Sequence, residues 1–152
     1  MKAARFLALL AAFTATACLA VPPDACQVIT MDEVNTIAAG AATKISQRSS
    51  GNPTECAFED SRRAAVLVVK IREVQYAAEN ELQHERENLE KIYRSKVKWI
   101  EGIGDRAFWL QANKSGKFRK GKIIVTVVFS REKNANEVDT MQVARLIENR
   151  LK

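Results

Sequence analysis

The chain has 152 residues, 47% hydrophobic and 28% charged, which is the composition of one globular domain and not of a disordered or fibrous chain. Its 24 Lys and Arg against 18 Asp and Glu give a net charge of +6, less basic than is typical of nucleic-acid-binding proteins. The single histidine, His84, removes most familiar active sites from consideration, and we interpret it as a solvated surface residue.

The first 20 residues have the pattern of a secretory signal peptide. Lys2 and Arg5 precede an apolar run over residues 6–13, and small residues follow up to Ala20. The apolar run is too short to span a hydrocarbon layer of about 30 Å. Cleavage after Ala20 predicts a single exported domain over residues 21–152, located in the periplasm or outer envelope.

A second cleavage scheme stays open, in which Cys18 carries a lipid. Residues 15–18 resemble a bacterial lipobox, with Ala15 in place of the usual Leu three residues before the cysteine. The sequence therefore predicts an exported protein that is either free or lipid-anchored.

Cys26 and Cys56 remain in either scheme. An even pair of cysteines in an oxidising compartment predicts a disulfide, worth on the order of 3 kcal/mol, with two buried free thiols as the alternative. No cluster of Cys and His has the spacing of metal ligands, so we expect neither a metal nor a cofactor.

The first elements of the mature chain are a short helix and three strands. Thr30 and Glu33 form a capping-box pattern, and Gly40 ends the helix that follows. The predicted strands cover residues 42–48, 56–58 and 64–74, of which the last is apolar on both faces at its centre.

A long helix is predicted over residues 76–96. Its apolar stripe is interrupted by Glu85 or Arg86, and its acidic residues precede its basic residues, which suits the helix dipole. We interpret its charged side as a solvated outer face, with a partner-binding surface as the alternative.

The remaining elements are strands over residues 97–100, 107–110 and 123–129, with a hairpin turn over 113–117, and a final helix. That helix begins near Asn134 or Asn136 and runs to Leu151. The predicted fold is α+β, in the order α-β-β-β-α-β-β-β-α. It has two to three helices on a mostly antiparallel sheet of five to six strands. The crossover through the long helix leaves a parallel strand pair open.

Three segments together resemble a known family. They are residues 26–34 (CQVITMDEV), 56–58 (CAF) and 102–109 (GIGDRAFW). In this order they are similar to a family of small bacterial exported lipoproteins and extracytoplasmic sensor-like domains of unknown function. The resemblance implies a PsbP-like α/β sandwich, a bridge between Cys26 and Cys56, and a role that is uncharacterised rather than enzymatic.

Two places could bind something. Five cations fall within nine residues with no acid between them, at Lys114, Lys117, Arg119, Lys120 and Lys122. They predict contact with an anionic membrane or polyanion surface, or an edge hairpin that lysines keep soluble. The second place is a small-ligand site beside the glycine turn, formed by Trp99, Asp105, Phe108 and Trp109. Strand alternation requires one of Phe108 and Trp109 to face away from the core.

The sequence has no nucleophile, zinc or phosphate-loop motif, so we predict no catalytic residues. We expect a non-catalytic, exported binding domain whose partner is an envelope protein, a small ligand or an anionic surface, and not nucleic acid. The alternative is a periplasmic inhibitor or immunity-type protein that blocks a toxin or hydrolase.

Overall fold

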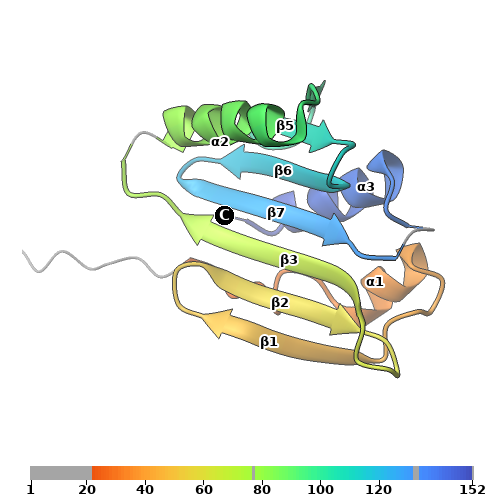
Figure 1. The fold of residues 1–152 in the computed structure, drawn as a ribbon. Coiled ribbons are helices and arrows are strands. Elements are labelled where there is room, and N and C mark those ends of the chain that lie inside the picture. The colour runs from red at the N-terminus through yellow and green to blue at the C-terminus, as the bar shows by residue number, and fades with distance from the viewer. Residues whose placement is uncertain (1–21, 77, 132–133, 152) are drawn as a thin grey trace, which may run out of the picture.

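The computed structural model of the protein describes residues 22–76, 78–131 and 134–151 (Figure 1). Within them, three helices and one seven-stranded sheet form an α+β fold. The helices are α1 (Met31–Ile37), α2 (Ala78–Tyr93) and α3 (Glu137–Glu148). The strands are β1 (Lys44–Ser50), β2 (Thr54–Glu59), β3 (Ala65–Glu73), β4 (Lys98–Ile100), β5 (Arg106–Leu110), β6 (Ser115–Lys120) and β7 (Ile123–Phe129).

The sheet has the order β1-β2-β3-β7-β6-β5-β4, and every neighbouring pair is antiparallel. The α+β class and the antiparallel sheet are therefore confirmed. The parallel alternative is wrong, because β3 pairs directly and antiparallel with β7, and α2 only leads the chain across the sheet to its far edge.

The strand count was too low because β6 was interpreted as a turn and a connecting segment. Gly116 lies inside this strand, where an added Cβ would collide with the side chains of Met141 and Thr140 in α3. The glycine therefore allows a helix to approach the sheet closely and does not mark a turn. The turn comes earlier, at Lys114, which has a φ of 52°.

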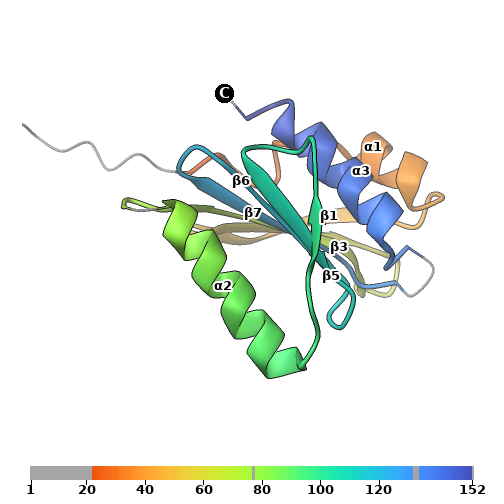
Figure 2. The same cartoon turned by 90° about the horizontal axis from the view of Figure 1, so that it is seen from above.

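The two faces of the sheet are covered by different helices (Figure 2). Helices α1 and α3 lie on one face and α2 lies on the other. The larger core is under α1 and α3, where alternate residues of the central strands, such as Val69 and Val127, join Val143 and Ile147 of α3. The β-branched, alternating pattern of these strands explains why their inner residues are fully buried.

The first residues of α1 and α3 follow the predicted caps, whereas α3 ends at Glu148 and not at the predicted Leu151. Thr30 and Glu33 form both hydrogen bonds of the capping box, and Asn136 is the N-cap of α3, so the later of the two predicted starts is the one observed. Helix α2 is shorter at both ends than predicted, and Arg94, with a φ of 50°, follows its last residue.

Cys26 and Cys56 form a disulfide, which confirms the predicted pairing. The disulfide joins the segment before α1 to β2, and the side chain of Cys56 lies in the larger core. In the part of the chain that the structure describes, no helix is long and apolar enough to cross a membrane.

Candidate binding surface

The five predicted surface cations are not brought together. Lys117 and Arg119 lie on the α2 side of β6, whereas Lys120 lies on the α3 side, because successive strand residues point to opposite faces. Each of the three has a carboxylate partner. The pairs are Lys117–Glu85 at 2.8 Å, Arg119–Asp105 at 3.5 Å and Lys120–Glu148 at 3.2 Å. Among the described residues, only Lys114 and Lys122 of the five form no ion pair.

The predicted small-ligand site is brought together only in part. Trp99 and Asp105 line one open pocket with residues 100–104 and Arg106, whereas Phe108 and Trp109 do not line it. Phe108 and Trp109 do point to opposite faces, but both are buried, because α2 covers the face that Phe108 occupies. Asp105 accepts a hydrogen bond from the Gly121 backbone at 2.8 Å, and its own N–H donates to the Arg119 carbonyl at 2.7 Å. Asp105 therefore fastens the β4–β5 turn to the β6–β7 hairpin.

Trp99 is the exposed aromatic of that predicted site. Trp99 lies on edge strand β4 and is 38% exposed, and its ring packs edge-to-face on Phe108 with centroids 5.9 Å apart. The guanidinium groups of Arg106 and Arg86 lie 4.5 and 5.8 Å from its centroid. Because these cations stack on the indole, Trp99 links the second half of α2 to the sheet edge and is not a free stacking platform.

Ion pairs hold much of α2 on the sheet. Arg72 of β3 reaches Glu81 at 2.8 Å and Glu85 at 2.6 Å, and Lys117 of β6 reaches the second oxygen of Glu85 at 2.8 Å. The apolar contact beneath α2 is small and centres on Leu82. Glu85 thus interrupts the apolar stripe because it bridges two strands from the inner side of the helix.

These sheet-facing charges were missed as a group from the sequence. The available signal was the spacing of Glu81 and Glu85, which lie one helical turn apart on the same face of the helix. Their partners, Arg72 and Lys117, stand at polar positions that alternate with apolar residues in two strands. That signal becomes readable only when β3 and β6 are known to lie under the same helix, with β7 between them.

The last turn of α2 and the residues after it form the most exposed part of the helix. We call residues 91–96 the α2 tip. Ile92 is 71% exposed and Tyr93 43% exposed, and Lys91, Arg94 and Lys96 are exposed cations. None of the three forms an ion pair with the residues that the structure describes.

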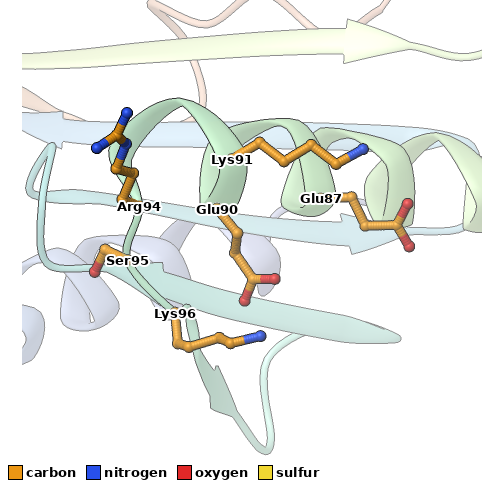
Figure 3. Close-up of a pocket in the computed structure, with 6 residues that line it drawn as sticks. All are labelled: Glu87, Glu90, Lys91, Arg94, Ser95 and Lys96. Atoms are coloured by element: carbon orange, nitrogen blue, oxygen red, sulfur yellow. The ribbon is translucent and has the colours of Figure 1, made fainter.

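The acids near the α2 tip are committed to contacts within the fold. Glu90 accepts hydrogen bonds from the Val97 N–H at 3.0 Å and from Arg86 at 3.3 Å. Glu87 accepts from Gln83 at 2.8 Å, which, with the further hydrogen bond from Arg86, lowers the pKa of its carboxyl below the usual range. A shallow pocket lies between these acids and the tip cations, lined by Glu87, Glu90, Lys91, Arg94, Ser95 and Lys96 (Figure 3).

Figure 3 shows the side chains of Lys91, Arg94 and Glu90 pointing in different directions. The three tip cations and the two acids line one pocket, but none of the cations forms an ion pair with a described carboxylate, and the α2 tip presents positive charge beside two exposed apolar side chains. Among the described residues, no group of His, Cys, Asp and Glu could hold a metal ion.

Compared with known proteins, the chain matches no family model, and no curated protein is similar to it in sequence.

Proposed function

We propose that the protein is an exported, non-catalytic binding domain of the cell envelope that contacts its partner through the α2 tip. The observation that carries the proposal is the concentration of exposed apolar and cationic side chains at one corner. Of the six large hydrophobic residues exposed in the described chain, Ile92 and Tyr93 are neighbours in the last turn of α2, beside the exposed cations of the α2 tip. Clustering of this kind is typical of an interaction surface, whereas single scattered apolar residues are not.

The Cys26–Cys56 disulfide supports export, because such bonds persist in oxidising compartments. The signal peptide, a lipid at Cys18 and the resemblance to exported lipoproteins remain predictions, and residues 1–20 lie outside the described residues.

The inhibitor or immunity-type alternative needs a charged surface that fits an enzyme. The acidic front of α2 is one surface that could serve, but Glu81 and Glu85 are engaged by Arg72 and Lys117. The basic hairpin was the other candidate, and most of its cations are paired within the fold. We therefore favour the α2 tip as the contact surface.

The proposal is tested in the cell and on a column. We expect the cell to accumulate a processed chain whose Cys26 and Cys56 are protected from alkylation until reduction. We also expect the immobilised protein to retain an envelope component, and Lys91→Gln/Arg94→Gln/Lys96→Gln to release it. An unprocessed cytoplasmic chain with both thiols alkylatable before unfolding would overturn the proposal. Equal retention of the envelope component by the wild type and the tip variant would overturn it as well.

A further inference from the structure

We propose that the α2 tip docks on the surface of an anionic phospholipid bilayer. This inference rests on the proposed function and names its partner. The occupant is the lipid surface itself, with Ile92 and Tyr93 entering the headgroup layer and Lys91, Arg94 and Lys96 facing lipid phosphates.

The shape of the corner suits a flat surface. Figure 2 shows that the C-terminal end of α2 projects away from the sheet, on the side opposite α1 and α3. All four residues at positions 91–94 are exposed, so the rest of the domain leaves much of this turn open to solvent. A protruding helix end of this kind can reach a bilayer without obstruction from the rest of the domain.

The side chains of the tip suit the polar boundary of a bilayer. Neighbouring helical residues point about 100° apart, so Ile92 and Tyr93 together cover a broad sector of the turn. Tyrosine is enriched at the level of lipid headgroups, where its ring is half apolar and half hydrated. Cations beside exposed apolar residues are the pattern of helices that lie in a membrane interface.

The charge of the tip is complementary to anionic lipid. Glu87 and Glu90 are held by Arg86 and, for Glu90, by the Val97 N–H, and the three tip cations together with Arg86 outnumber these two acids, so the corner stays positive. At the surface of an anionic leaflet, three such cations together strengthen binding by roughly 100-fold.

Helix stability alone does not account for the tip. Cations in the last turn complement the helix dipole, which explains why Lys91 and Arg94 stand there. It gives no reason for a side chain as apolar as Ile92 to be 71% exposed. Nor does the tip suit a stable protein partner by itself, because a standard protein interface buries about 800 Å² on each side, over roughly 20–30 residues.

Vesicle binding tests the inference. The protein, in the form that the cell accumulates, is sedimented with vesicles of phosphatidylglycerol and phosphatidylethanolamine and with vesicles of phosphatidylcholine alone. Lys91→Gln/Arg94→Gln/Lys96→Gln should lose about 100-fold in partitioning to the anionic vesicles. Ile92→Ser/Tyr93→Ser should lose about tenfold through the lost apolar contact.

The matched control is Lys44→Gln/Arg62→Gln/Arg145→Gln, which removes the same charge from exposed positions outside α2. We expect it to lose less than about threefold, because none of these cations belongs to the α2 tip. Unchanged urea midpoints would show that all three variants remain folded.

Two outcomes would overturn the inference. Equal losses in the two triple variants would mean that net charge alone attracts the protein to lipid. Absence of binding to anionic vesicles would exclude the lipid surface, and if the α2 tip still governed retention of an envelope protein, the proposed function would stand with a protein partner.

Discussion

Replacing Glu85 by Gln tests whether ion pairs hold α2 on the sheet. The Glu85 carboxylate binds Arg72 at 2.6 Å through one oxygen and Lys117 at 2.8 Å through the other. The substitution keeps the size of the side chain and one oxygen acceptor but removes the charge that both cations share. It therefore changes the electrostatic attachment with little change in packing.

The expected cost follows from the burial of the three side chains. Glu85, Arg72 and Lys117 are 25%, 27% and 16% exposed. Fully exposed pairs contribute about 0.2–1 kcal/mol, and hydrogen bonds to charged groups about 1.5–3 kcal/mol. Two pairs between these limits predict that Glu85→Gln weakens the attachment of α2 by about 2 kcal/mol.

Amide hydrogen exchange measures this loss where it occurs. We expect faster exchange in α2 and little change in β2, β3 and β7, because the helix opens as a local unit. The control is Glu79→Gln, which removes an exposed acid from the same helix and costs at most about 0.5 kcal/mol through the helix dipole. If the two variants exchanged alike, the ion pairs would not hold the helix and the reasoning would be wrong.

Three further predictions concern the stability of the whole domain, measured by urea unfolding. Reducing the Cys26–Cys56 disulfide, which spans 30 residues, should lower the free energy of unfolding by about 3–4 kcal/mol, while alkylation without reduction changes nothing. The pKa of Glu33 is lowered to about 2, chiefly by its hydrogen bond from Arg150. Because the folded pKa lies below the unfolded value, this contribution is present above about pH 4.5 and is lost as the pH falls towards 2. Between about pH 4.5 and pH 2, the free energy of unfolding of Glu33→Gln should therefore fall by about 1 kcal/mol less than that of the wild type. This value allows for solvent screening of a partly exposed pair. Gly104→Ala should cost about 2 kcal/mol more than Gly102→Ala, because both glycines have positive φ but only at position 104 would a Cβ collide with the Arg119 backbone; equal costs would contradict this geometry.

The strands and helix caps that could be predicted are determined by residues close to one another in the sequence. The segments that became β3 and β7 are β-branched and apolar, and the capping box at Thr30 needs only residues within one helical turn. The disulfide followed from the count of cysteines, because only one pair remains after the signal region. Such features depend on few neighbours, so sequence reasoning reaches them.

Strand β6 and the charged contacts of α2 depend on the tertiary arrangement. From its sequence neighbours, Gly116 was interpreted as part of a turn, whereas in the structure it lies in a strand and allows α3 to pack closely on the sheet. Lys117 belonged to a cluster of cations in the sequence, yet the fold sends it to Glu85 and its neighbour Lys120 to Glu148. Charge density along a chain therefore does not predict charge density on a surface when the residues alternate across a sheet.

The α2 tip and the ion pairs beneath α2 belong to the same helix. Lipid binding at the tip and opening of the helix should therefore affect each other, and both effects can be measured. If a bilayer binds the docked helix better than the opened one, lipid must slow exchange in α2 by up to the ratio of the two affinities, because coupling is reciprocal. Glu85→Gln should weaken vesicle binding only to the extent that it populates the opened helix. The tip variant Lys91→Gln/Arg94→Gln/Lys96→Gln should abolish the lipid effect on exchange. Without lipid it should change exchange by no more than about 1 kcal/mol, which is what cations contribute at a helix C-terminus, since these cations make no ion pair within the described residues. A tip variant that opened α2 in the absence of vesicles would show that the tip cations serve the fold, and the docking surface would lose its independent support.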